Sequence, residues 1–119
     1  MRVRAARGAI AVAADDAPAL LAATERLLSA MVDRNRIGTE DLVSILFTAT
    51  EDLRSAFPAE AARRMGLGRV PLMCAREISV EGSMARVVRV LLHFHSEIAL
   101  DDVVHVYLDG AETLRDDLD

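Results

Sequence analysis

The sequence predicts an α+β domain, of the broad α/β class, in which a mixed β-sheet carries one long helix and short helices on one face. Three observations indicate this fold. Segments with strand-like alternation recur along the chain, one segment has the spacing of an amphipathic helix, and Gly, Pro and acidic residues separate these segments. A chain of 119 residues can bury one core, so residues 1–119 are expected to form a single domain.

The chain begins with a strand-like segment over residues 2–12. Because successive side chains of a strand point to opposite faces, Arg7 is expected to face away from Arg2 and Arg4. The first strand therefore separates Arg7 from the arginines that precede it in the sequence.

One long amphipathic helix is expected next. Asp16 is in position to cap its N-terminus, and Pro18 suits its first turn because that turn needs no backbone donor there. Side chains at helical spacing then continue until Gly38 ends the pattern. This stripe consists of Leu20, Leu21, Thr24, Leu27, Leu28, Met31 and Val32.

The rest of the chain alternates between strands and short helical segments. A second strand is predicted over Leu42 to Ala49, followed by a helical segment around Asp52 to Phe57. A further helical turn from Ala59 to Met65 fits between Pro58 and Gly66. The remaining strands are predicted at 70–75, 86–95 and 103–109.

The charge composition excludes several classes of function. All 14 basic residues are arginine, so chemistry that depends on a Schiff-base lysine or a phosphate-loop lysine is ruled out. The net charge of -5 argues against broad nucleic-acid binding, and one Tyr and three Phe offer few stacking platforms. An anion site must therefore be local, with a few arginines focused in one cleft.

The compartment follows from the single cysteine and from the first residues of the chain. One cysteine cannot form an internal disulfide, which fits a reducing environment. The short apolar segment near the N-terminus ends at Asp15 and Asp16, too early for a secretion signal. We expect a cytoplasmic protein with no membrane span.

Arg89 is the most informative candidate for function, because it interrupts the apolar run from Val87 to Leu92. A guanidinium in such a strand must meet solvent, a carboxylate or an anionic ligand. Arg7, Glu77 and Tyr107 are further candidates, together with Cys74. Arginines, a carboxylate and a phenol are the groups that bind a small polyanion carrying a hydroxyl.

Taken residue by residue, simpler interpretations remain open. Arg89 would suit a solvated strand face, and Cys74 would suit a small core position. Tyr107 would suit a half-buried strand position, and Glu77 an exposed loop. Strict alternation also puts Cys74 and Glu77 on opposite faces, so both would reach one ligand group only if the strand ended or bulged between them.

Seven segments in order resemble one known family, the small AroH-type monofunctional chorismate mutases. The resemblance covers nearly the whole chain and implies a homotrimer with a pseudo-barrel of sheets and with active sites between adjacent subunits. It also implies that the chain converts chorismate to prephenate without metal or cofactor. The seven segments are Val3 to Ala9, Thr48 to Leu53, Phe57 to Ala59, Val70 to Glu77, Arg89 to Val90, His105 to Leu108, and Leu114 to Arg115.

The same resemblance implies roles for individual residues. Arg89 would stabilise charge on the ether oxygen of the substrate, and Glu77, assisted by Cys74, would accept a hydrogen bond from its hydroxyl. Arg7 and Tyr107 would bind carboxylate oxygens. Phe57, Ala59, Met73 and Leu114 would form pocket walls, with Arg63 and Arg115 near the mouth. Glu60 stands where the family often has a basic residue, which is expected to weaken long-range attraction of a dianion.

Two alternatives come from other functional classes. His93, His95 and Glu97 share one strand face, an arrangement that could bind zinc and support hydrolysis. The chain could instead be a non-catalytic trimeric anion binder, or a deaminase of the reactive-intermediate type. Neither of the last two gives an evident purpose to Tyr107 or to the segment from Cys74 to Glu77.

Overall fold

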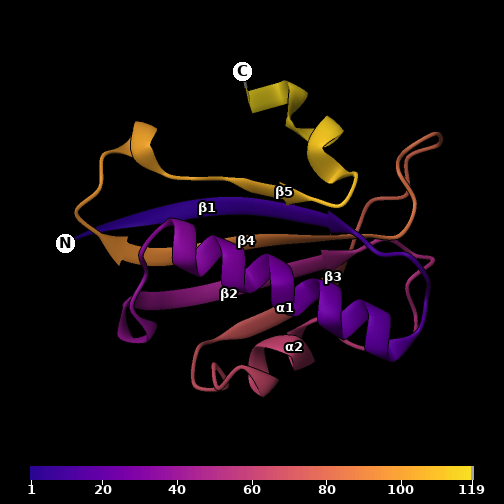
Figure 1. The fold of residues 1–119 in the computed structure, drawn as a ribbon, viewed down its shortest axis with the longest axis horizontal. Coiled ribbons are helices and arrows are strands. Elements are labelled where there is room, and N and C mark those ends of the chain that lie inside the picture. Colours follow the sequence, from indigo (N-terminus) through magenta and orange to yellow (C-terminus); the bar gives the residue numbers. More distant parts are fainter. Residues whose placement is uncertain (119) are drawn as a thin grey trace.

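Five strands form one mixed sheet, with helices on one of its sides (Figure 1). The computed structural model describes residues 1–118, and side chains as far as Leu114. The strands are β1 (Arg2–Ala11), β2 (Leu42–Ala49), β3 (Leu72–Arg76), β4 (Val87–Ser96) and β5 (Val106–Leu108), in the spatial order β3-β2-β4-β1-β5. Strand β4 is central and antiparallel to β1 and β2, whereas β3 and β5 pair in parallel at the two edges.

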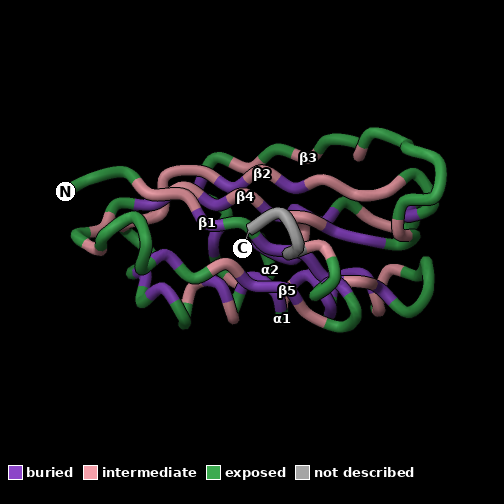
Figure 2. The backbone as a smooth tube through the Cα atoms, turned by 90° about the horizontal axis from the view of Figure 1, so that it is seen from above, coloured by how far each residue is buried: buried purple, intermediate pink, exposed green. Residues whose placement is uncertain are grey.

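The long helix α1 (Ala17–Arg34) begins as the sequence predicts. The Asp16 side chain caps it, because Oδ1 accepts a hydrogen bond from the Ala19 backbone N–H at 2.8 Å. A short helix, α2 (Ala59–Arg64), lies on the same side of the sheet, so α1 and α2 together cover one face (Figure 2). Three 3₁₀ segments complete the fold: η1 (Thr39–Asp41), η2 (Leu100–Asp102) and η3 (Ala111–Leu118).

The main core lies between the sheet and the helices. Alternate residues of the three inner strands point toward α1 and are fully or almost fully buried, whereas their neighbours in sequence face the other way. The helix contributes the predicted stripe from Leu20 to Met31, all of it buried. The strands contribute Ala6, Ile10, Ile45, Phe47, Val88, Val90, Leu92 and Phe94. We call the opposite side, which neither α1 nor α2 covers, the open face of the sheet.

The predicted helical segment from Asp52 to Phe57 is wrong, because this stretch consists of turns and bends. Polar side chains in this stretch and just before it hydrogen-bond to backbone groups elsewhere in the fold, which does not favour a helix here. The Asp52 carboxylate accepts the Arg86 N–H at 3.1 and 3.2 Å, and the Thr50 hydroxyl accepts the Val87 N–H at 3.1 Å. Short polar side chains that bond to backbone in this way compete with helix formation.

The last strand is shorter than the predicted 103–109, because a side chain takes the place of a strand partner at Val104. The buried Asn35 amide accepts the Val104 N–H at 2.8 Å and donates to its carbonyl at 2.9 Å. Strand pairing starts only at Val106, opposite Gly8. Helix α1 ends at Arg34, earlier than the predicted limit at Gly38, and the remaining predicted elements agree with the structure to within two residues at each end. Within residues 1–118, none of the helices has the length and apolar character needed to cross a membrane.

At Gly8, β1 packs tightly against side chains of α1. A Cβ atom at this position would lie 2.5 Å from Met31 Sδ, 3.1 Å from Leu27 Cδ1 and 3.1 Å from the Val106 carbonyl oxygen. Met31 and Leu27 are themselves fully buried, so they have little room to move.

We predict that Gly8→Ala lowers the free energy of unfolding by about 1 to 3 kcal/mol, because overpacking forces the helix away from the sheet. Gly68→Ala is the matched control, since a Cβ there meets nothing within 4 Å. Urea denaturation of both variants tests this, and equal midpoints for the two would contradict it.

Candidate active site

Arg89 lies on the open face of the sheet, in the middle of its central strand. It pairs with Ala9 of β1 on one side and with Thr48 of β2 on the other. The side chain is 43% exposed, yet Nε is buried and has no hydrogen-bond partner among the side chains described, which end at Leu114. A buried donor without a partner costs free energy, so this atom is held where a ligand or a neighbouring acceptor can use it.

Glu77 is the carboxylate beside Arg89. It follows directly after β3, and its backbone N–H continues the pairing with a 2.9 Å hydrogen bond to the Ala49 carbonyl. Glu77 Oε1 is 3.3 Å from Arg89 Nε, and Oε2 accepts a 2.5 Å hydrogen bond from the Thr48 hydroxyl. The carboxylate is therefore held between a cation and a hydroxyl, and only 26% of the side chain is exposed.

A hollow of about 220 Å³ on the open face brings together five of the predicted site residues. They are Arg7, Glu77, Arg89, Tyr107 and Leu114. Gly8, Leu46, Thr48, Val90 and Leu91 complete the lining. Among the described lining residues, two guanidinium groups outnumber one carboxylate, which suits an anionic ligand. We call it the Arg89 hollow.

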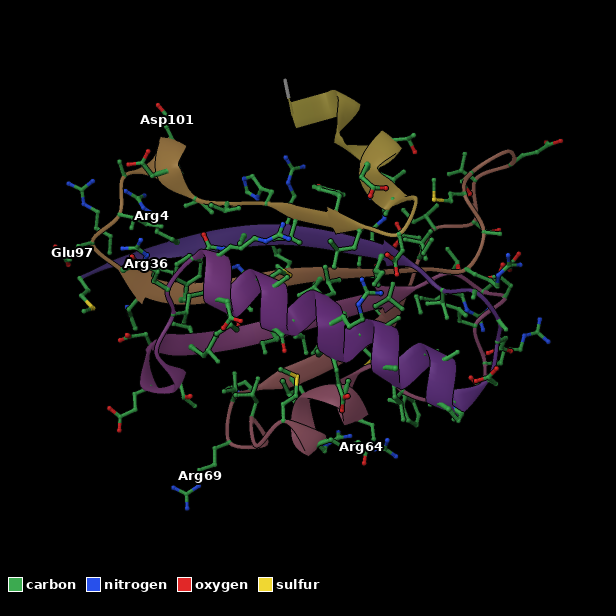
Figure 3. All side chains as sticks on the ribbon, in the orientation of Figure 1. Arg4, Arg36, Arg64, Arg69, Glu97 and Asp101 are labelled. Atoms are coloured by element: carbon green, nitrogen blue, oxygen red, sulfur yellow. The ribbon has the colours of Figure 1, made fainter. Side chains whose placement is uncertain are left out.

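The strands of the sheet fix where Arg7 and Tyr107 lie. As predicted, Arg7 faces away from Arg4, whose Nε donates to the Ile98 carbonyl at 3.0 Å near the far end of the sheet (Figure 3). The Arg7 backbone N–H donates to His105 Nδ1 at 3.0 Å, just before β1 starts to pair with β5. Tyr107 pairs with Ala9, the residue opposite Arg89, and is 9% exposed.

A second, smaller apolar cluster on the open face holds η3 beside the Arg89 hollow. Ala9, Val87, Tyr107 and Ala111 are buried in it. Leu114 and Met84 pack against them and are partly buried. The cluster therefore explains how a residue near the C-terminus comes to line the same hollow as Arg7 and Arg89.

The structure does not bring Cys74 next to Glu77 within one chain. The register between β2 and β3 is regular from Ile45 to Ala49, so Cys74 faces the main core and Glu77 the open face. The bulge that would let both side chains reach one hydroxyl is absent from this pairing. Cys74 instead lines a different hollow, of about 470 Å³, together with Phe57.

The other predicted wall and mouth residues also lie outside the Arg89 hollow of their own chain. Phe57 and Met73 are 74% and 66% exposed, whereas Ala59 is buried in the main core. Arg63 donates to Glu60 at 3.1 Å on the surface of α2, so Glu60 is partly neutralised by its own helix. The side chain of Arg115 lies outside the described residues.

The segment that leads to Phe57 is tied down by a single carboxylate. Asp15 Oδ1 accepts the backbone N–H groups of Arg54 at 2.9 Å and Ser55 at 3.1 Å. The hydrogen bond from Arg54, followed by those from Ser55, lowers the pKa of Asp15 below its usual value. The backbone that leads to Phe57 is therefore held in place, even though the Phe57 side chain is exposed.

The described residues do not provide a set of ligands for the zinc site considered as an alternative. His93 Nδ1 is 3.2 Å from the Ser44 hydroxyl, and His95 is exposed on its strand. Among the described side chains of residues 1–114, no three from His, Cys, Asp or Glu lie close enough together to hold a metal ion.

Comparisons with known proteins agree with one another over almost the full length. The family model described as chorismate mutase type I matches residues 3–118. The chain belongs to the type I chorismate mutase family. It is 51% identical to the chorismate mutase AroH of Thermus thermophilus over 118 residues, which is 98% of this chain and 97% of the relative. Chorismate mutase activity, an isomerisation, follows from this membership.

Two further relatives of this chorismate mutase support the same assignment. The chorismate mutase AroH of Bacillus subtilis is 36% identical over 119 residues, covering 99% of this chain and 94% of the relative. A solved chorismate mutase structure from Clostridium thermocellum aligns with a TM-score of 0.90 at 43% identity, covering 92% of this chain and 97% of that one. The match confirms the α+β fold with one long helix and disfavours the deaminase alternative.

Thr48 is the residue of this chorismate mutase that sequence reasoning missed. It lines the Arg89 hollow and donates to Glu77, but in the sequence it is one polar residue near the end of a strand. The feature that identifies Thr48 is its strand register, because it lies directly opposite Arg89. That signal becomes visible only when the pairing of β2 with β4 is known.

Proposed function

We propose that this chain converts chorismate to prephenate at the Arg89 hollow, in a homotrimer whose adjacent subunits complete each site. The observation that carries the proposal is the guanidinium of Arg89, which lies beside Glu77 and whose buried Nε has no hydrogen-bond partner in the described part of the chain. A single domain over residues 1–119 and a cytoplasmic location are part of the same proposal, the latter supported by the free thiol of Cys74.

The reaction is an intramolecular rearrangement, so it requires no nucleophile, proton transfer or cofactor. The enzyme must hold the dicarboxylate in a compact, chair-like conformation and stabilise charge that grows on the ether oxygen as its bond to carbon breaks. Arg7 and Tyr107 bind carboxylate oxygens in this proposal, and Glu77 accepts a hydrogen bond from the substrate hydroxyl. Arg89 faces the ether oxygen and interacts most strongly in the transition state.

The residues outside the Arg89 hollow support the trimer. Phe57 and Cys74 line one hollow, and exposed Met73 lies on the strand that carries Cys74. One chain thus carries two separate groups of predicted site residues, and a neighbouring copy would join the two. The open face also leaves Leu46 and Leu91 only partly buried, as expected of a surface that a second copy covers.

A spectrophotometric assay of chorismate consumption by the purified chain, without added metal or cofactor, tests the proposed function. Prephenate formation supports it. Binding of a dicarboxylate without turnover would favour the anion-binder alternative instead.

We predict that Arg89→Ala lowers kcat by roughly 10² to 10³-fold or more, since loss of one charge-stabilising donor costs about 2.7 to 4 kcal/mol. Arg89→Lys keeps the charge but loses the planar fork, so it is expected to remain strongly impaired. Arg69→Ala is the matched control, because Arg69 is exposed and extends into solvent beyond α2 (Figure 3). Wild-type rates for both Arg89 variants would overturn the role of Arg89.

Arg7→Ala and Tyr107→Phe are expected to act mainly on substrate binding, because their proposed contacts are made equally in the ground and transition states. The Michaelis constant should rise strongly for Arg7→Ala, which loses a charged bidentate donor, and mildly for Tyr107→Phe. Steady-state kinetics separates the two parameters. A large fall in kcat at unchanged KM would argue against this division of roles.

The proposed sites between subunits predict complementation between two inactive variants. Arg89→Ala removes one half of the site, and Phe57→Asp places a negative charge where the other half would meet the dianion. If mixed trimers form with head-to-tail contacts, about a quarter of the sites in an equal mixture combine two intact halves. Co-refolding followed by the same assay tests this, and a mixture no more active than its components would contradict shared sites.

A further inference from the structure

Thr48 lies between the strand that carries Arg89 and the strand that leads to Glu77. It is the penultimate residue of β2, half-buried on the open face, and its two partners across the sheet are Arg89 of β4 and Ala75 of β3. Glu77 is two residues beyond Ala75 on the same face. The register of three strands therefore fixes the position of one hydroxyl relative to both charged groups.

The hydroxyl of Thr48 has a defined direction. An ionised carboxylate only accepts hydrogen bonds, so the 2.5 Å contact with Glu77 Oε2 requires Thr48 to be the donor. A β-branched side chain in a strand has few accessible χ1 rotamers, which keeps the donor in place. One oxygen of the Glu77 carboxylate is thus occupied by a hydrogen bond from β2.

The hydrogen bond from Thr48 limits how Glu77 can pair with Arg89. An arginine and a carboxylate at this distance commonly form a bidentate pair with two parallel hydrogen bonds. Here Oε1 is 3.3 Å from Nε, but the contact does not have hydrogen-bond geometry, so Nε is not satisfied by any side chain that the structure describes. A carboxylate that turned fully toward Arg89 would occupy the guanidinium edge that an anionic ligand needs.

We propose that Thr48 is a positioning residue that holds Glu77 away from a bidentate pair with Arg89 and so keeps the guanidinium available to substrate. The inference rests on the proposed roles of Glu77 and Arg89. Thr48 acts through Glu77 and touches no reacting atom. Without the Thr48 hydroxyl, Glu77 pairs more fully with Arg89 in the free enzyme, so the substrate must compete with Glu77 for Arg89.

Thr48→Val keeps the shape and β-branching but removes the donor. We expect kcat/KM for chorismate to fall about tenfold or more, mostly through a higher KM, because hydrogen bonds to charged groups are among the stronger ones. Thr48→Ser restores the hydroxyl and should return kcat/KM to within about threefold of wild type. Ser44→Ala is the matched control, a hydroxyl loss on the same strand that should leave kcat/KM unchanged.

A double-mutant cycle with Glu77→Gln separates positioning from a merely structural role. The neutral amide cannot form an ion pair with Arg89, so Thr48→Val should cost less than about twofold in this background. Calorimetric binding of prephenate gives the same comparison where turnover is too slow. Wild-type kcat/KM in Thr48→Val, failure of Ser to rescue, or an equal loss in the Gln background would each overturn the proposal. Because all of these are measured against an active wild type, an inactive wild type would refute the proposed function instead.

Discussion

The constraint on which the site depends is a positive charge in the centre of the sheet. Arg89 is on β4, whose two neighbours leave it no edge, and the side facing α1 is filled by Val88, Val90 and their apolar partners. The guanidinium can therefore only face the open side. Its Nε atom is buried, and burial of a charged donor without an acceptor nearby is costly; the topology brings Glu77 Oε1 to within 3.3 Å of Nε.

The partners of Arg89 across the sheet are small, and this is as important as its charge. Ala9 on one side and Thr48 on the other leave room for a long side chain to lie over the sheet. Strand β3 runs parallel to β2, so its carboxyl end delivers Glu77 to the place where β2 ends. The crossover from β2 through α2 to β3 thus sets the distance between the two charged groups. A change of one residue in that register would point Glu77 into the core.

The sequence predicted the elements whose signals are local. The stripe of α1, its cap at Asp16 and the apolar runs of β2 and β4 each depend on neighbouring residues, and all three elements are present. The wrong elements depend on distant partners. Asp52 binds the Arg86 backbone instead of starting a helical turn, and Asn35 takes the place of a strand partner at Val104. Neither contact could be foreseen without the tertiary arrangement.

For the site, the family resemblance identified candidate residues but did not say on which face of the sheet each of them lies. Arg7, Glu77, Arg89, Tyr107 and Leu114 meet in one hollow, whereas Phe57 and Cys74 meet in another. A linear motif such as Cys74 to Glu77 contains members of both groups, because alternation along β3 sends its residues to opposite faces.

That alternation has a consequence for how an enzyme of this size can build a pocket. A two-layer domain has one face committed to its core, so a single chain can surround a ligand on the open face only with loops and its C-terminal segment. Here η3 and the residues after β3 provide part of that wall, and the hollow stays open. A second copy placed over the exposed side of β3 would supply the missing wall and cover apolar surface such as Met73. Assembly would then also close the active site, so the proposed trimer and the proposed site depend on each other.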